Sequence, residues 1–398
     1  MEMGEEWEAR FERWLDPFLE AFGHKVRRKW APIYLRGLIA PGERKSIEPL
    51  VARVAPGEVQ QVHHFVAMSR WATEPIEEVL FEKADALVGG DDAHLIVDDT
   101  AVPKKGEHSV GVAHQYCGAL GKQANCQCLV SVTLARDDVP VPIALRLHLP
   151  EAWANDAARR KKAFVPETVV YRPKWQMALE EIVRIRHAGV RFGDVLADAG
   201  YGCAAEFRHG LSSLGLRWAV GIQSSQLVYS ANVRVRPPKR SSAKGPSPRH
   251  GRPTEDRRSV ADVIADLGPK AFRAVSWRTG TKGALRGRFA AVRVRPADGV
   301  DIGQRVRLPS DEVWLIAEAR TQETRYYLCN YAANASLKQL AATIKARWSC
   351  EQAHQQMKEE LGLDHFEGRS WHGLHHHAVL TMVAFAFLQE LRCRENKA

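Results

Sequence analysis

The sequence lacks a long apolar run. No stretch approaches the roughly 20 consecutive apolar residues that a membrane-spanning helix requires. The opening segment MEMGEEWEAR is acidic, so it also lacks the basic and then apolar layout of a signal peptide. These absences argue against a transmembrane or secreted protein, and we expect a cytoplasmic one.

Cysteine is scarce and unevenly spaced. The seven cysteines are Cys117, Cys126, Cys128, Cys203, Cys329, Cys350 and Cys393. An odd number without regular spacing is no disulfide framework, so free thiols are expected. The alternative is a zinc site made of His114, Cys117, Cys126 and Cys128, which has suitable ligand types but not the paired CxxC spacing of structural zinc sites.

Acidic residues are few in one long stretch of this basic protein. The whole chain carries a net charge of +10, but residues 224–310 hold 19 Lys and Arg against 6 Asp and Glu. This stretch therefore carries +13 and the remainder carries −3. Such a concentration of positive charge favours a polyanionic partner.

The length of 398 residues predicts two or three domains. Residues 1–88 are expected to be helical, because WEARFERWLDPFLEAF has large apolar side chains at steps of three and four. A second helical stretch is interrupted between Trp71 and Pro75. The sequence leaves open whether these helices form a plain bundle or a DNA-reading domain.

The pattern changes near Ala93, where short apolar runs predict strands. Strands are expected in AHLIVDD, CQCLVSVTLAR and PVPIALRLHLP, followed by a helix in KWQMALEEIVRIRHAG and a strand in FGDVLADAGYG. Residues 223–310 form a basic stretch that contains an expected loop in VRPPKRSSAKGPSPRHGRPTEDRR, and further strands are expected around this loop in FRAVSWR, FAAVRVR and DEVWLIAEAR. This order predicts an α/β fold with a mixed sheet flanked by helices.

Carboxylates stand at the ends of two of these expected strands. Asp98 and Asp99 end one strand and Asp198 ends another, whereas Asp194 starts the latter strand. A buried strand holds a carboxylate rigidly, and carboxylate oxygens are the ligands that Mg²⁺ prefers. Such a site suits phosphodiester chemistry, in which two metal ions activate the attacking oxygen and stabilise the leaving one.

A third carboxylate is expected from a helix near the strand ends. In RWSCEQAHQQMKEELGL, Arg347 lies four residues before Glu351 and Lys358 lies seven after it, so one face of a single long helix would carry all three. That face can hold a metal ion and meet DNA phosphates. The alternative is an ordinary solvated face with a charge pair.

Together, IVDDT, LADAGYG and RWSCEQAHQQMK resemble the three catalytic segments of bacterial insertion-sequence DDE transposases. The family signature is Tyr, two residues, Arg, three residues, Glu, six residues, Lys. Arg347, Glu351 and Lys358 match it, whereas Ile344 stands in the place of the tyrosine. The resemblance covers residues 90–390.

This resemblance implies an RNase H-like core with a β-rich insertion. Asp98, Asp198 and Glu351 would be the catalytic residues and the ligands of two Mg²⁺ ions, with Mn²⁺ as a substitute. Asp98 is preferred over Asp99 because the family's aspartate stands two residues before a threonine, here Thr100.

The implied domains are an N-terminal helical DNA-binding domain (1–88), the first part of the core (89–222), the basic insertion (223–315) and the second part of the core (316–398). Further candidate DNA contacts are Lys104, Lys105, Arg347, Lys358 and Trp277. The histidines His372, His375, His376 and His377 could contact DNA, assist near the metal ions, or simply pack.

The resemblance implies cut-and-paste transposition. The protein would bind the terminal inverted repeats of its element as a homodimer, cleave the DNA with metal-activated water and join the 3′-hydroxyl ends to target DNA. Two alternatives remain open: a domesticated DNA-binding protein without turnover, and a metal-dependent nuclease that does not transpose. In each case the bacterial protein would associate with the nucleoid when bound to DNA.

Overall fold

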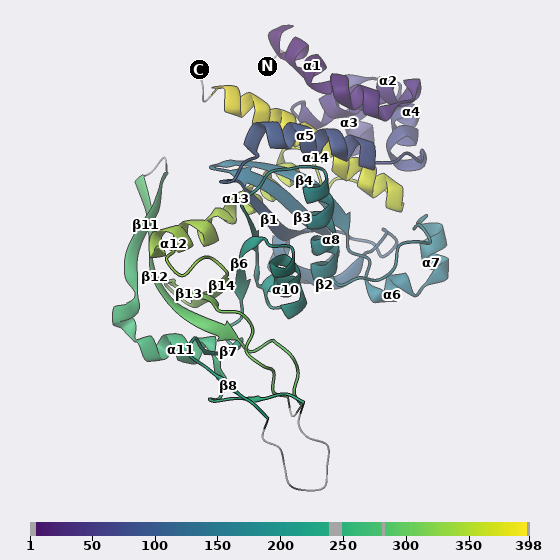
Figure 1. Ribbon diagram of the computed structural model, residues 1–398. Helices are drawn as coiled ribbons and strands as arrows, with labels where there is room; N and C mark the ends of the chain where they lie inside the picture. The colour runs from purple at the N-terminus through teal and green to yellow at the C-terminus, as the bar shows by residue number, and fades with distance from the viewer. Residues whose placement is uncertain (1–4, 239–248, 281–282, 304, 396–398) are drawn as a thin grey trace. The chain divides into compact units, whose positions relative to one another are not determined.

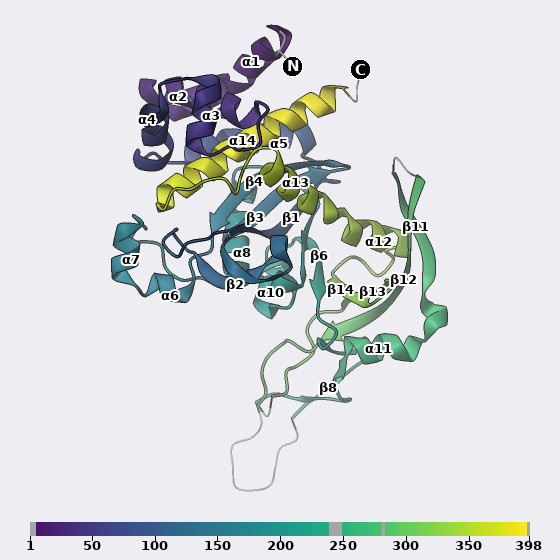
Figure 2. The same cartoon turned by 180° about the vertical axis from the view of Figure 1, so that it is seen from behind.

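The computed structural model describes residues 5–238, 249–280, 283–303 and 305–395 (Figures 1 and 2). The chain divides into two compact units, one made of residues 1–193 and 348–398 and the other of residues 194–347. Each unit contains β-strands with helices packed against them. A parallel strand pair in the second unit, among otherwise antiparallel pairs, makes the sheet mixed. This confirms the expected α/β, RNase H-like fold. The middle of the expected basic loop, residues 239–248, lies outside the described residues.

The first unit begins with helices, as the apolar spacing predicted. They are α1 (Glu5–Phe22), α2 (Lys25–Ile39), α3 (Ile47–Val54), α4 (Val59–His63), a π-helical turn (His64–Met68) and α5 (Glu74–Val88). The predicted interruption before Pro75 is therefore confirmed.

These helices pack on the C-terminal helix α14 (Trp371–Glu395), whose Phe387 ring lies 5.2 Å from the ring of Phe11 and 6.0 Å from that of Trp14. In the part of the chain that the structure describes, no helix is both long and apolar enough to cross a membrane.

The sheet of the first unit is antiparallel and centred on β3 (Lys122–Arg136). One edge of β3 pairs with β1 (His94–Pro103), and the other pairs with β2 (Ala113–Cys117) and β4 (Val139–Leu147). Residues on both faces of β3 are buried, as expected when helices cover both sides of a sheet. These helices are α8 (Lys174–His187) and α13 (Trp348–Glu359). Short helices α6 (Glu151–Ala154) and α7 (Ala157–Lys162) follow β4.

The second unit starts with the parallel pair β5 (Asp194–Ala197) and β6 (Arg217–Ile222), joined through α9 (Ala199–Gly202) and α10 (Ala205–Ser213). The sheet continues antiparallel from β6 through β14 (Thr324–Cys329) and β13 (Val313–Ala319) to β12 (Gly283–Pro296). β12 pairs in turn with β11 (Arg273–Gly280) and β7 (Leu227–Ser230). The remaining elements are β8 (Val235–Arg236), β9 (Arg252–Pro253), β10 (Arg258–Ser259), α11 (Val260–Leu267) and α12 (Leu337–Ala346). The β-rich character of the basic stretch is thereby confirmed.

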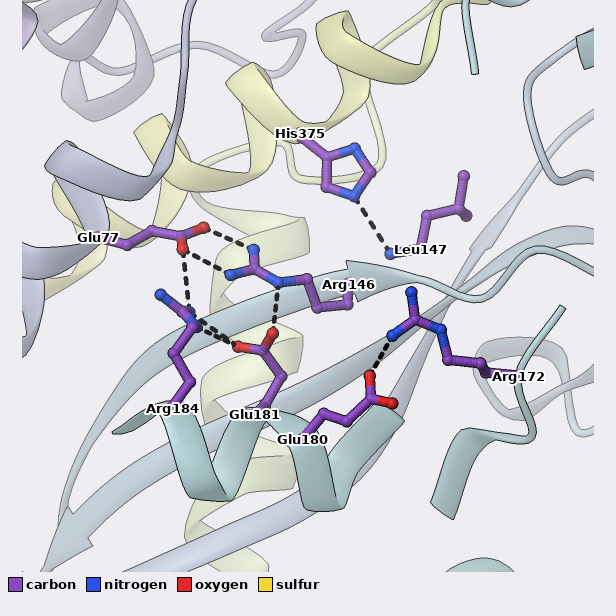
Figure 3. A network of polar contacts seen from close by, with 8 residues as sticks. All are labelled: Glu77, Arg146, Leu147, Arg172, Glu180, Glu181, Arg184 and His375. Atoms are coloured by element: carbon purple, nitrogen blue, oxygen red, sulfur yellow. Dashed lines mark hydrogen bonds and ion pairs between the residues drawn. The ribbon is translucent and has the colours of Figure 1, made fainter. Parts of the chain in front are cut away.

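A cluster of four buried or half-buried charges joins three elements of the first unit (Figure 3). Arg146 on β4 donates to both carboxylate oxygens of Glu77 on α5, at 2.6 and 2.5 Å, and to Glu181 on α8 at 2.9 Å. Arg184 completes the cluster, with contacts of 3.0 Å to Glu77 and 2.8 Å to Glu181. Two cations and two anions balance, so no buried charge is left uncompensated. Despite its burial, the Glu77 carboxyl has a lowered pKa because of these arginines.

Substituting Glu77→Gln should destabilise the protein by about 3 kcal/mol, because Arg146 and Arg184 would then share one carboxylate in a buried setting. The measurement is the free energy of unfolding from urea titration at pH 7. The matched control is Glu367→Gln, which removes an ion pair to Arg44 with both side chains about two-thirds exposed and should change stability by less than about 1 kcal/mol. Equal effects of the two substitutions would contradict this role of the cluster.

Candidate active site

Asp98 and Asp99 point to opposite faces of the sheet in the first unit. In the antiparallel register, Asp98 lies opposite Ser131 and Asp99 lies opposite Val130. Side chains directly opposite each other in neighbouring strands share a face, and successive residues alternate between faces. The contacts of Ser131 therefore identify the helix on the face of Asp98, and the contacts of Asp99 identify the helix on the other face.

Asp99 faces α8. Lys174, the first residue of that helix, places its Nζ atom 2.6 Å from Asp99 Oδ2. Burial alone would lower the pKa of Lys174, but the Asp99 carboxylate and the Cys128 thiol together raise it. Burial, reinforced by Asp99, raises the pKa of Cys128 to about 12. Asp99 is thus engaged in an ion pair on the α8 face.

Asp98 faces α13, the helix that carries Glu351. Ser131, on the same face as Asp98, lies with its hydroxyl 2.8 Å from Nε2 of His354 on α13. Thr133, two residues further along β3, contacts Cys350 of the same helix at 3.6 Å. These buried polar contacts fix α13 against the face that carries Asp98.

Glu351 and Lys358 both belong to α13. Their spacing of seven residues places them two turns apart on one side of the helix, with Glu351 exposed and Lys358 half-buried. Burial lowers the pKa of Lys358, and electrostatic interactions with Asp364, Cys117, Cys128 and Asp98 partly oppose this shift.

Asp198 lies in the second unit, directly after β5, as the strand-end interpretation predicted. It is the N-cap residue of α9, and its Oδ1 accepts hydrogen bonds from the backbone N–H groups of Gly200 (2.9 Å) and Tyr201 (3.3 Å). A Cβ atom on Gly202 would lie 2.0 Å from the carbonyl oxygen of Gly221, so only glycine lets this turn approach β6 so closely. The turn holds the Asp198 carboxylate rigidly at the strand end.

Asp194 has a different environment, at the start of β5. Its carboxylate accepts a hydrogen bond from the hydroxyl of Tyr331, and it is 4% exposed. Burial and the Asp194 charge raise the pKa of Tyr331, which keeps this donor protonated. Asp194 is therefore engaged by Tyr331 at the start of the strand.

The three predicted carboxylates are divided between the two units, with Asp98 and Glu351 in the first and Asp198 in the second. Across the described ranges, no three or more His, Cys, Asp or Glu side chains are grouped so as to hold a metal ion. The chemistry of the three donors nevertheless fits Mg²⁺, since all are carboxylates. The candidate zinc ligands Cys117, Cys126 and Cys128 are free thiols, and burial raises the pKa of Cys126 to about 11.

The expectation of one continuous helix through Arg347 is wrong. α12 ends at Ala346, Arg347 lies in a turn, and α13 begins at Trp348. The reason is that the buried positions do not continue at helical spacing through this segment. A helix that buries Thr343 and Ile344 would next bury positions 347 and 348, but Trp348 is 40% exposed and the following two residues are buried.

The other predicted DNA contacts have varied surroundings. Lys105 is exposed, whereas Lys104 donates through Nζ to the carbonyl oxygen of Phe366 at 2.6 Å. Trp277 is half-buried, with its ring 5.7 Å from that of Phe289 and the Lys345 ammonium 5.2 Å from its ring centroid. Packing therefore occupies part of the Trp277 surface.

The four candidate histidines lie in the first turns of α14 and pack inside the first unit. His376 stacks on Trp71 with ring centroids 3.7 Å apart, and the two His376 nitrogens lie 2.9 Å from the carbonyl oxygens of Val66 and Trp71. His377 has Nδ1 2.8 Å from the Tyr34 hydroxyl and Nε2 3.0 Å from the Gly362 carbonyl oxygen. These contacts support a packing role for His376 and His377.

Two contacts near the candidate site escaped the sequence interpretation. The ion pair of Lys174 with Asp99 joins residues 75 positions apart, and the contact between His354 and Ser131 joins residues 223 apart. Neither has a local motif. The expected start of α8 and the alternation along β1 could have suggested the ion pair of Lys174 with Asp99. Nothing in the sequence indicates the contact between His354 and Ser131.

Comparison with known proteins identifies a family that the sequence matches. The sequence matches, over residues 17–284, the family described as DDE superfamily endonuclease, and this range includes Asp98 and Asp198. A probable transposase for insertion sequence element IS701 from Microchaete diplosiphon is 28% identical over 193 residues. The match covers 48% of this chain and 48% of that protein, so the chain matches about half the length of this relative.

The packing of His377 predicts a pH dependence of stability. Burial lowers its pKa to about 4, and burial also keeps the Tyr34 hydroxyl protonated by raising its pKa, so Tyr34 donates to the neutral ring. Because the folded pKa is below the unfolded value of about 6.5, the stabilising contribution is complete above pH 6.5 and is lost as the pH falls towards 4. At pH 5 the loss should be about 2 kcal/mol relative to pH 7.5.

In the variant His377→Gln, the change in unfolding free energy between pH 7.5 and pH 5 should shrink by this amount. The exposed His63→Gln serves as the control and should leave the pH dependence as in wild type. An unchanged pH dependence in His377→Gln would contradict the neutral, buried state of this ring.

Proposed function

The chain belongs to the DDE superfamily of endonucleases, and from this premise we propose that it is the transposase of an insertion sequence. The observation that supports the proposal is the difference in surroundings between Asp98 and Asp99. Asp99 is engaged by Lys174 on the α8 face, whereas Asp98 lies on the face covered by α13, the helix of Glu351 and Lys358.

In this proposal, Asp98, Asp198 and Glu351 would hold two Mg²⁺ ions. When bound, such ions would activate a water or 3′-hydroxyl oxygen for attack and stabilise the leaving oxygen. Asp98 and Asp198 are held rigidly by a strand and by a capped turn, respectively, and Lys358, on the same helix as Glu351, would contact a DNA phosphate. Lys105 and Arg347 would add contacts to the DNA backbone.

The partner in this proposal is double-stranded DNA, first the terminal inverted repeats of the element and then the target. The basic residues 224–310, within which β7 to β12 lie, would neutralise phosphates and make binding dependent on salt. Two element ends must be held at once, which a symmetric homodimer does naturally. The domain limits proposed from the sequence, at residues 88, 222 and 315, belong to the same proposal.

The roles of the carboxylates can be tested on DNA carrying the inverted repeats that flank the gene. With Mg²⁺ or Mn²⁺, wild type should nick the ends and join them to a second duplex. Asp98→Asn, Asp198→Asn and Glu351→Gln should each lose more activity than the roughly 10- to 100-fold typical of residues outside the direct ligand set. Asp99→Asn is the matched control for Asp98→Asn, because it makes the same change on the opposite face, and should lose no more than about tenfold.

Binding of the same duplex, measured by fluorescence anisotropy, should be retained in all four variants and shows that they fold. Cleavage that survives Glu351→Gln or Asp98→Asn would remove that residue from the site. Nicks that are never joined would indicate a nuclease that does not transpose. Binding without any cleavage by wild type would favour a domesticated DNA-binding protein.

A further inference from the structure

The first unit contains a basic cavity away from the α13 face described above. Its volume is about 900 Å³, and it lies between the loop before α5, the α7 segment and the start of α14. The residues that matter for its chemistry are Arg70, Arg160, Lys161, Phe164, Trp371 and His372. Glu167 is the one acidic residue in its lining, against three Arg and Lys. The cavity is therefore suited to an anion that also has an apolar part.

The backbone at Phe164 has an unusual conformation. Phe164 follows the C-cap residue of α7 with φ of +55°, in the left-handed region. Its N–H bonds to the carbonyl of Lys161 and the N–H of Val165 bonds to that of Arg160, which is the hydrogen-bond pattern of a Schellman motif. Glycine normally takes this position because it has no Cβ atom. A phenylalanine at this position therefore adopts a backbone conformation that disfavours residues with a Cβ atom.

Burial of the ring does not explain this choice. Phe164 is 46% exposed, with the edge of its ring against His372 at 5.6 Å between centroids. The Arg70 guanidinium lies 5.2 Å from the ring centroid. An exposed aromatic held in a disfavoured conformation points to a role in binding.

The surrounding structure holds this ring in place. Arg160 is committed to the cavity wall, because its guanidinium donates to the carbonyl oxygens of Val169 (2.7 Å) and Pro166 (2.9 Å). The N–H of Trp371 donates to the carbonyl of Ala163 at 2.8 Å and ties the turn to α14. Arg70 and Lys161 are both exposed and are the cations available to a ligand.

We propose that this cavity binds an unpaired nucleotide of a DNA strand, with its base stacked on Phe164 and its phosphates at Arg70 and Lys161. The inference rests on the proposed function only in that the latter supplies DNA as the partner. A paired base is stacked within the duplex and cannot reach the ring, whereas any unpaired base can stack on an aromatic face. The combination of an exposed aromatic with flanking cations is the usual means of binding single strands.

The test uses the full chain, a fluorescent dT20 strand and a 20-base-pair duplex, with dissociation constants measured by anisotropy. Phe164→Gly should weaken dT20 binding roughly tenfold, the effect of one lost stacking contact, and leave duplex binding unchanged. Phe164→Trp should retain dT20 binding. Tyr116→Ala is the matched control, because Tyr116 is 65% exposed on β2 outside the cavity, and it should bind as wild type.

The same variant separates binding from folding. Since glycine is the favoured residue at this turn, Phe164→Gly should melt at the same temperature as wild type or higher. If its melting temperature falls instead, Lys161→Glu takes its place: it should weaken dT20 binding and reduce the slope of log Kd against log salt by about 0.7, the value for one phosphate on a single strand.

Wild-type affinity of Phe164→Gly for dT20, or equal weakening by Tyr116→Ala, would overturn the inference. If wild type binds and cleaves duplex ends while the Phe164 variants leave dT20 binding unchanged, the inference fails and the proposed function stands. If wild type binds neither DNA, both fail.

Discussion

The neutral cluster of Glu77, Arg146, Glu181 and Arg184 is the constraint on which the first unit depends. A carboxylate that is 1% exposed is tolerated only if cations reach it, so α5 must lie where Arg146 of β4 and Arg184 of α8 converge. The cluster thereby ties α8 to the sheet. That same helix begins with Lys174, which holds Asp99, and strand alternation then directs Asp98 to the other face.

The two faces of this small sheet consequently have different tasks. On the α8 side, charges are paired and the arrangement is structural. On the α13 side, the polar contacts of Ser131 and Thr133 fix the helix that also carries Glu351 and Lys358. A hydroxyl paired with an imidazole positions a helix without introducing a second charge beside Asp98.

Much of this arrangement could be predicted from the sequence, because it is written in local patterns. The apolar runs that became β1, β3 and β5 and the stripe that became α8 follow directly from periodicity, and so does the position of Asp198 after β5. The expectation that Asp98 and Asp99 end their strand is wrong, because β1 continues to Pro103 and both residues lie in its middle. Two features could not be predicted. The strand β6 is a run of six residues, too short for periodicity to distinguish a buried strand from part of a helix, and the break at Arg347 depends on which residues are buried on either side of it. Partners such as Lys174 and Asp99 are joined only by tertiary folding.

Strand β4 has one strand partner among the described residues, β3, and its other edge is covered by α5 and by α14. Helix α14 begins at Trp371, more than 200 residues after β4 ends at Leu147. At a synthesis rate of about 5–20 residues per second, the ribosome needs on the order of 10–45 s to reach the start of that helix after it has completed β4. During this interval the edge of β4 lacks the cover that α14 gives it in the folded protein.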